Sequence, residues 1–339
     1  MGRIMATMGP LAPPPPVRKV FIVGGTHGNE SNGVQLAKHL MRHPELYSHF
    51  SFETHVLISN PASVAKNSRY VEEDMNRCFM LKDLADGSLT SLEAKRAKEL
   101  NAILGPKGAS PQADLIIDLH NTTASTGHVM LLSPKDELSA AIAAYLQTVD
   151  DSVRVCHWNP NATDYPMLPS IGRHGFTFEV GAVPWGVVDA KLYQQSLKLI
   201  LQSLKYVDAH NACCKVAGQA KVKPWLEGEI DAFSLVRAVD YPRDDAGELA
   251  GIIHPELQGR DFEPIHRGDP AFLALDGETA IPWVPKRTHE QASVPRGAEE
   301  EEEDQLYPFF INEAAYYEKG TAFMLANRFR RKLTMAPVD

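Results

Sequence analysis

The chain has 339 residues, of which 44% are hydrophobic and 23% charged, as in an ordinary globular enzyme that buries a sizeable core. Its 34 basic and 43 acidic residues give a net charge of −9, which argues against nucleic acid as a partner, because phosphates require a basic surface. No segment approaches the roughly 20 apolar residues of a membrane-spanning helix, so no membrane partner is expected.

The N-terminal residues 1–16 contain a single cation, Arg3, and end in four consecutive prolines. This composition predicts a flexible tail rather than a signal peptide. The four cysteines include no Cys-x-x-Cys spacing and two of them are adjacent, which indicates reduced thiols. Both observations favour a cytoplasmic location.

The next segment predicts part of a metal site. The apolar run Val20–Val23 is typical of a buried strand, and the pattern from Val34 to Met41 is typical of a helix. His27 and Glu30 lie on the glycine-rich turn between them, where open α/β sheets hold their ligands. An imidazole with a carboxylate suits zinc, which takes three protein ligands in catalytic sites and leaves a fourth position open. A third ligand is therefore needed.

Two guanidinium groups and an amide stand close together at Arg69, Asn76 and Arg77. The planar fork of arginine binds a carboxylate through two hydrogen bonds, so these residues are candidates for holding an anionic substrate. The acidic residues 72–74 between them offer an alternative, a surface salt-bridge network. The residues alone favour that alternative.

The candidate third ligand follows the apolar residues Leu115–Ile117. Side chains alternate along a strand, so Asp118 and His120 point to the same face. His120 is then able to bind a metal ion at the end of the sheet. Asp118 and the neighbouring Asn121 are expected behind the ligands, where a carboxylate can orient an imidazole.

Glu179 lies near the end of another short strand, Phe176–Gly181. A carboxylate beside zinc can take a proton from water and pass it to a leaving amine. Its apolar neighbours Phe178 and Trp185 would raise its pKa. Without further information, a lone glutamate in a strand is more typical of a charge on an edge strand.

Apolar strands alternate with helical patterns up to about residue 211, which predicts an α/β fold with a mostly parallel sheet covered by helices. Beyond it the chain becomes strand-like, and Asp276-Gly277 between two apolar runs predicts a hairpin. We therefore expect a catalytic domain at 17–211 and a smaller β domain at 212–339. The acidic segment at about 286–305 is expected to be a disordered surface loop. The main helical patterns cover residues 91–104, 138–146 and 188–207.

Six blocks stand in order along the chain: GGTHGNE, SRYVEEDMNR, IIDLHNTT, FTFEVG, DYPRDDAGELAGIIHPEL and INEAAYYEKG. In these blocks the chain resembles the aspartoacylase family of zinc amidohydrolases, part of the broader zinc carboxypeptidase-like group. The resemblance implies a zinc carboxypeptidase-like mixed sheet flanked by helices, plus a smaller C-terminal β domain that narrows access to the zinc. It also implies one Zn²⁺ per subunit on His27, Glu30 and His120, and a homo-oligomer, namely a dimer.

The same resemblance assigns roles to individual residues. Glu179 is implied as the general base, and Arg69 as the group beside the scissile carbonyl. The substrate is a small N-acyl amino acid. The implied substrate contacts are Arg69, Asn76, Arg77, Tyr165, Glu179 and Tyr316.

The implied reaction is zinc-dependent hydrolysis of the amide bond of N-acyl-L-amino acids, such as N-acetylaspartate to acetate and aspartate. Two departures leave the substrate open. Animal aspartoacylases have an arginine at the place of Pro169, from which Arg173 is offset by four positions, and a lysine at the place of Gly320. Hydrolysis of N-acyl aromatic amino acids, as in the sister aminoacylase, is therefore the alternative. A zinc carboxypeptidase and a non-catalytic zinc-binding module are more distant alternatives.

Overall fold

The computed structural model describes residues 14–158, 162–217, 225–285 and 305–338. Most of the predicted N-terminal tail, at residues 1–13, and of the predicted acidic loop, at 286–304, lies outside the described residues. Within the described residues, no helix combines the length and the apolar character needed to cross a membrane.

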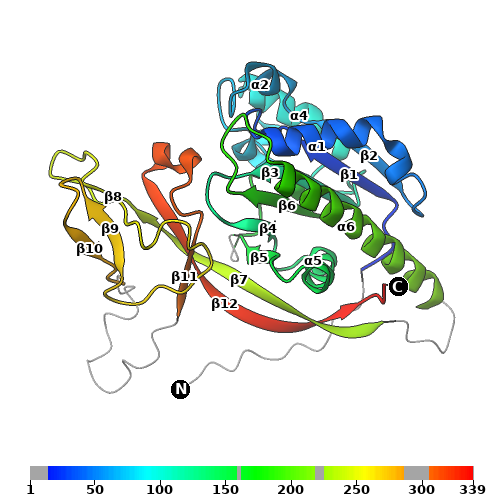
Figure 1. Ribbon diagram of the computed structural model, residues 1–339. Coiled ribbons are helices and arrows are strands. Elements are labelled where there is room, and N and C mark those ends of the chain that lie inside the picture. The colour runs from blue at the N-terminus through cyan, green and yellow to red at the C-terminus, as the bar shows by residue number, and fades with distance from the viewer. Residues whose placement is uncertain (1–13, 159–161, 218–224, 286–304, 339) are drawn as a thin grey trace.

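A nine-stranded mixed sheet forms the centre of the molecule (Figure 1). Its strand order is β11-β12-β7-β5-β4-β6-β3-β1-β2. Strands β2, β1, β3 and β6 run parallel, and β4 pairs antiparallel with β6. The strands are β1 Lys19–Gly24, β2 Glu53–Ile58, β3 Leu115–Asn121, β4 Gly127–Leu132, β5 Arg154–His157, β6 His174–Gly181, β7 Leu226–Asp240, β11 Leu306–Phe309 and β12 Thr321–Met335.

Helices cover both faces of this sheet. On one face, α1, α5 and α6 pack against apolar side chains of β1, β3 and β6. On the other face, α4 packs against Phe21, Val23 and Ile116, together with the short elements η2 and η3. Every residue of β3 is buried, as expected for a central strand covered on both sides. The helical elements are α1 Ser31–Arg42, η1 Pro44–Leu46, α2 Pro61–Lys66, η2 Met75–Arg77, α3 Leu81–Ala85, α4 Leu92–Leu104, α5 Glu137–Val149, η3 Leu168–Ile171, α6 Ala190–Ala217 and η5 Ala314–Lys319.

A small three-stranded antiparallel sheet follows in the order β10-β9-β8, with β8 at Gly251–Ile253, β9 at Pro270–Ala274 and β10 at Ala280–Pro282. The predicted hairpin is confirmed, because β9 and β10 pair on either side of Asp276-Gly277. Gly277 has φ of 79°, a left-handed conformation that favours glycine.

The two sheets are linked by the longest strands of the described chain. β7 and β12, each of 15 residues, pair antiparallel and reach from the nine-stranded sheet toward the small one (Figure 1). The main sheet therefore continues across residue 211. The division into domains at 17–211 and 212–339 stays a prediction.

Candidate metal centre and active site

Three buried residues meet at the carboxyl ends of β1 and β3. His27 and Glu30 lie on the loop between β1 and α1, and His120 lies in β3 beside it. One ligand atom from each of the three falls within 4.8 Å of the other two. The glycine-rich loop makes this approach possible, because a Cβ added at Gly28 would lie 2.0 Å from the backbone of Ser63.

The donor atoms of the cluster point at one another. Glu30 Oε1 lies 2.6 Å from His27 Nδ1, and its other oxygen lies 2.8 Å from His120 Nδ1. The two Nδ1 atoms are 3.1 Å apart. Tetrahedral zinc with bonds of about 2.0–2.1 Å holds its ligands about 3.3 Å apart, so this set of nitrogen and oxygen donors fits such an ion.

Each imidazole is oriented by a carboxylate on its far side. His27 Nε2 lies 3.0 Å from Asp74 Oδ1, and His120 Nε2 lies 2.8 Å from Asp118 Oδ2. The second oxygen of Asp118 accepts a hydrogen bond of 2.8 Å from Thr26 Oγ1. With the proton held at Nε2, the lone pair of each Nδ1 faces the cluster.

Asp118 thus lies behind His120, and its role behind a metal ligand stays a prediction, whereas the position of Asp74 behind His27 was not foreseen. Burial opposes ionisation of Asp74, but the hydrogen bond and charge of His27, with Arg69, hold its pKa well below its ordinary value. In the sequence, Asp74 could not be distinguished from its neighbours Glu72 and Glu73. Asn121 contributes its backbone N–H, which donates to Glu30 Oε2 at 3.1 Å.

The cluster stabilises positive charge between its carboxylates. Burial disfavours the charged form of Glu30, yet His27 and His120 hold its pKa far below its ordinary value. Burial also lowers the pKa of His120, but Asp118 and Glu30 raise it well above its ordinary value. A bound metal ion would supply the same positive charge.

Glu179 lies on the neighbouring strand, paired in register with His120. Their side chains therefore leave the same face of the sheet, about 4.8 Å apart at the backbone. Glu179 is half-buried. Burial, with the charges of Glu30 and Glu313, raises its pKa to about 8, against the opposing effects of His120 and Arg69. The carboxyl can therefore hold and release a proton near neutral pH.

The structure brings Arg69 and Asn76 into this cluster. The guanidinium of Arg69 donates to Glu30 Oε1 at 3.1 Å and to Asp74 Oδ2 at 3.4 Å, and its side chain is only 16% exposed. The amide of Asn76 lies 3.4 Å from His120 Nε2. Arg77 is exposed and donates to the backbone oxygen of Asn76 at 2.7 Å. A purely superficial salt-bridge network does not describe these contacts.

Tyr316, in η5, faces the same groups from the C-terminal part of the chain. Burial, with the charges of Glu179 and Glu313, raises the pKa of its hydroxyl, while Arg69 and Arg77 lower it. The ammonium of Lys319 lies 5.4 Å from the centre of the Tyr316 ring, a cation–π contact. Lys319 adds a cation here that sequence reasoning did not single out.

Glu313 was also missed. Its Oε2 accepts hydrogen bonds from the hydroxyl of Thr122, from the backbone N–H of Thr123 at 2.7 Å and from Thr123 Oγ1 at 3.0 Å. Glu313 is buried and joins η5 to the loop that follows His120 and β3. A glutamate next to an asparagine gives no local signal of such a long-range role.

Family models match both halves of the chain. The model described as "Succinylglutamate desuccinylase/Aspartoacylase catalytic domain" matches residues 16–207. The model described as "AstE/AspA barrel-sandwich hybrid domain" matches residues 228–290 and 293–328. The chain belongs to the succinylglutamate desuccinylase/aspartoacylase family.

Several relatives and one solved structure in this family are similar over nearly the whole chain. A Nostoc protein named "Probable aspartoacylase" is 38% identical over 92% of this chain and 97% of its own. The "N-acyl-aromatic-L-amino acid amidohydrolase (carboxylate-forming)" of Homo sapiens is 35% identical over 94% of this chain and 92% of its own. The crystal structure of murine aminoacylase 3 superposes with a TM-score of 0.81 at 33% identity, covering 95% of this chain and 99% of that one.

The family models, the relatives and the solved structure confirm three predictions from the sequence. These are the family itself, the mixed α/β sheet with a further β-rich part, and the enzyme class, a hydrolase of amide bonds. The comparisons do not assign roles to individual residues, so the candidate catalytic and substrate-binding residues remain predictions.

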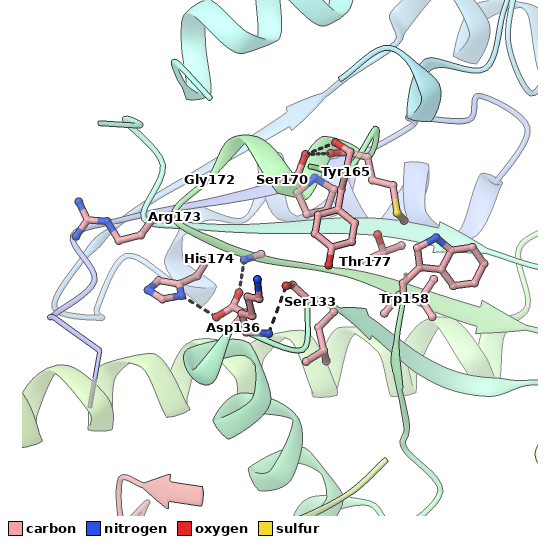
Figure 2. A pocket seen from close by; sticks show the side chains of 15 residues that line it. Ser133, Asp136, Trp158, Tyr165, Ser170, Gly172, Arg173, His174 and Thr177 are labelled. Carbon is pink, nitrogen blue, oxygen red and sulfur yellow. Dashed lines mark hydrogen bonds and ion pairs between the residues drawn. The ribbon is translucent and has the colours of Figure 1, made fainter. Parts of the chain in front are cut away.

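Four other residues singled out in the sequence, Tyr165, Pro169, Arg173 and Gly320, are not part of the metal cluster itself. Tyr165 lines a cavity beside β6 whose wall also includes Thr177 (Figure 2). Pro169 is buried in η3. Arg173 lies before the first residue of β6, at the opposite end from Glu179, and its guanidinium is 3.7 Å from Asp114. Gly320 has φ of 68°, a left-handed conformation that a lysine adopts only with strain.

Proposed function

We propose that this chain hydrolyses the amide bond of N-acyl-L-amino acids with one zinc ion per subunit, held by His27, Glu30 and His120. The observation that supports it most directly is the convergence of these three donor sets beside Glu179. A bound zinc ion supplies Lewis-acid chemistry that activates water and polarises a carbonyl. Three protein ligands leave a position open, as catalytic zinc sites require.

Glu179 carries the proton in the proposed reaction. Its carboxylate accepts a proton from the attacking water and delivers it to the nitrogen of the departing amine. A pKa raised to about 8, chiefly by burial, makes both transfers feasible near neutral pH. Because Glu179 is paired with His120 on the neighbouring strand, its carboxylate lies beside His120 during both proton transfers.

Arg69, Asn76, Arg77 and Tyr316 bind and orient the substrate. Arg69 presents a charged donor beside Glu30 Oε1, where it stabilises the oxyanion that develops on the amide carbonyl. The other three hold the substrate carboxylate, so that the amide is fixed in position before it reacts. Tyr165 is the weakest of the proposed substrate contacts, because the cavity that it lines does not include His27, Glu30 or His120 in its wall.

Selectivity for aromatic N-acyl amino acids is a second candidate. Recognition of an aspartate side chain needs a cation for its second carboxylate. Pro169 and Gly320 carry none, and Arg173 lies beside Asp114 at the far end of β6. The cations beside Tyr316 are Lys319, Arg69 and Arg77, and the two arginines already serve the oxyanion and the substrate carboxylate. These observations favour N-acetyltyrosine over N-acetylaspartate.

The test is release of free amino acid from N-acetylaspartate and N-acetyltyrosine by zinc-loaded protein, with chelator-treated protein and the Glu179→Gln variant as controls. We expect the variant to retain zinc and to lose at least about 10³-fold in kcat. A fully active variant would exclude Glu179 as the base. Release from neither substrate would exclude the proposed reaction.

We also propose a cytoplasmic dimer with a catalytic part at 17–211 and a C-terminal β part at 212–339. The four cysteines all lie within the described residues and form no disulfide with one another, which is consistent with the cytoplasm. Light scattering coupled to size-exclusion chromatography measures the mass in solution. A mass of one chain, 37.4 kDa, would contradict the dimer.

A further inference from the structure

Glu93 lies in the first turn of α4, yet its side chain is completely buried. Its Oε1 accepts hydrogen bonds from the backbone N–H of Val71 at 2.7 Å and from Asn60 Nδ2 at 3.1 Å. Its Oε2 accepts from the backbone N–H groups of Glu72 at 3.1 Å and Glu73 at 3.3 Å. One carboxylate therefore holds three consecutive backbone donors of a single loop.

The charged form of Glu93 suits these donors. Burial opposes its ionisation, but the hydrogen bonds from the three backbone N–H groups and from Asn60 keep the pKa of Glu93 below its ordinary value. Hydrogen bonds to a charged acceptor are roughly twice as strong as those between neutral groups. Because all four donors are neutral amides, the carboxylate fixes the path of the loop rather than forming one half of an ion pair.

The loop held in this way carries groups of the candidate active site. Residues 67–74 connect α2 to η2 and form neither helix nor strand. Arg69 donates to Glu30 Oε1 at 3.1 Å. Asp74 lies 3.0 Å from His27 Nε2. The three anchored N–H groups stand between Arg69 and Asp74 in the chain, so fixing them limits where both side chains can reach.

Asn60 extends the same network to the glycine-rich loop between β1 and α1. Its Nδ2 donates to Glu93, which ties the start of α2 to the neighbouring α4 (Figure 1). Its Oδ1 accepts from the backbone N–H of Ser63 at 3.2 Å and so caps α2. Its own backbone N–H donates to Gly25 O at 3.2 Å. A carboxylate on α4 is therefore linked, through one buried residue, to the loop of two candidate metal ligands.

A role confined to the helix does not account for this arrangement. An acidic residue in the first turn of a helix interacts favourably with the helix dipole at an exposed position as well. The N-cap of α4 is Ser91, whose Oγ accepts from Ala94 N at 3.0 Å. The backbone donors that Glu93 binds lie 20 to 22 positions earlier in the chain. The buried carboxylate therefore serves the loop more than the helix.

We propose that Glu93 is a positioning residue for amide hydrolysis: by fixing the loop at residues 71–73, it places Arg69 and Asp74 against the metal cluster. Within the described residues, its hydrogen bonds reach only this loop and Asn60, so an effect on turnover passes through the loop. The effect on turnover rests on the proposed function, whereas the anchoring of the loop can be measured without turnover.

The first test is hydrogen–deuterium exchange of the zinc-loaded protein and its Glu93→Gln variant. Gln keeps the size of the side chain, but its NH2 group faces a donor in either orientation. We expect the amides at 71–73 to exchange at least about tenfold faster, because a charged acceptor is lost. Peptides of β3 should remain protected, which shows that the chain stays folded. Glu99→Gln, at an exposed glutamate of the same helix, is the matched control and should exchange as the wild type does.

The second test is kinetic and separates positioning from a general loss of stability. Assays at saturating zinc remove the contribution that passes through Asp74 and the metal. We expect Glu93→Gln to lower kcat for the preferred N-acetyl substrate about 10–100-fold, since a misplaced Arg69 no longer meets the developing oxyanion. In the Arg69→Ala background the same substitution should cost less than about threefold, because its route to the reaction is then absent.

Unchanged exchange at 71–73 would overturn the proposal, and so would equal losses of kcat in the wild-type and Arg69→Ala backgrounds. Glu93→Asp keeps the charge but is one methylene shorter, so intermediate values of both readouts are expected. This variant decides the question where the Gln variant does not fold. If the wild type hydrolyses neither N-acetyl substrate, the proposed function fails, and faster exchange in the variants still supports the anchoring of the loop.

Discussion

His27 and His120 have the same kind of surroundings although they are far apart in the sequence. Each imidazole has a carboxylate at Nε2 and shares Glu30 at Nδ1. The grouping of the three candidate ligands could be predicted, because His27 and Glu30 follow one recognisable strand and His120 lies near the end of another. The carboxylate behind His27 could not, because Asp74 comes from a loop whose path depends on tertiary packing.

Replacing Asp74 by Asn should weaken metal binding about 10–100-fold, because His27 Nε2 then faces a neutral amide in place of the carboxylate that raises the basicity of its ring. Competition with a chromogenic chelator measures the affinity. Glu72→Gln is the control, since this exposed carboxylate on the same loop accepts from Leu92 N and, among the residues that the structure describes, does not contact the cluster. Equal affinities of the two variants would contradict the role given to Asp74.

The pH dependence of activity should reflect Glu179. Its ionised form is the base, and its pKa is raised to about 8 by burial. Activity must therefore rise with increasing pH, with a midpoint at or below about 8, because a bound cation lowers the pKa further. The profile of kcat/KM against pH reports this group in the free enzyme. A profile that falls with rising pH between 6 and 8 would contradict the assignment.

At the scale of elements, local pattern was sufficient for most of the fold. The run at Val20–Val23 became β1, and the helical pattern from Val34 to Met41 became α1. The contact between η5 and the end of β3 had no such pattern, because Glu313 and Thr123 are 190 positions apart. A single carboxylate accepts several hydrogen bonds there, which ties Tyr316 to the loop after His120.

Glu313→Ala should lower both stability and turnover, since it leaves several buried donors without an acceptor. We expect a loss of roughly 3 kcal/mol and a Tm lower by about 5 °C. Glu313→Gln keeps one acceptor and should recover part of that loss. Because the charge of Glu313 raises the pKa of Glu179, the Gln variant should also shift the rise of kcat/KM to lower pH.

Differential scanning fluorimetry and pH-rate profiles measure these effects. Glu318→Gln is the control, because this exposed side chain of the same η5 accepts hydrogen bonds from the hydroxyl of Tyr70 and from none of the buried donors that Glu313 serves. A purely structural role for Glu313 would lower Tm without moving the pH profile, and that result would contradict the electrostatic part of the prediction.

At the scale of the whole molecule, the main difference from the sequence-based expectation is the continuity of the sheet. The composition suggested a domain boundary near residue 211. However, β7 and β12 belong to the same nine-stranded sheet as β1 and β3. Their pairing joins residues about 100 positions apart, such as Arg331 and Ile230. No local pattern encodes such a register, so the β-rich character was predictable and its attachment to the main sheet was not.

Asp261, between β8 and β9, binds the segment that follows β11. Its Oδ1 accepts from the backbone N–H of Ile311 at 3.1 Å, and its Oδ2 is buried without a partner within the described residues. Burial raises its pKa to about 7, although backbone donors at Ile311, Phe310 and Ser125 oppose this. The folded state therefore keeps a proton that the unfolded state releases at lower pH.

Because the folded chain binds more protons between the ordinary pKa of 3.8 and about 7, this group makes stability fall as pH rises through that window. Asp261→Asn keeps the accepting oxygen and cannot ionise. It should raise Tm by about 1–3 °C at pH 8 and by less at pH 5, where only part of the window between 3.8 and about 7 has been crossed. Thermal unfolding at both pH values measures the difference. Asp245→Asn, at an exposed position, is the control, and an equal effect of both variants at pH 8 would show that surface charge alone is responsible.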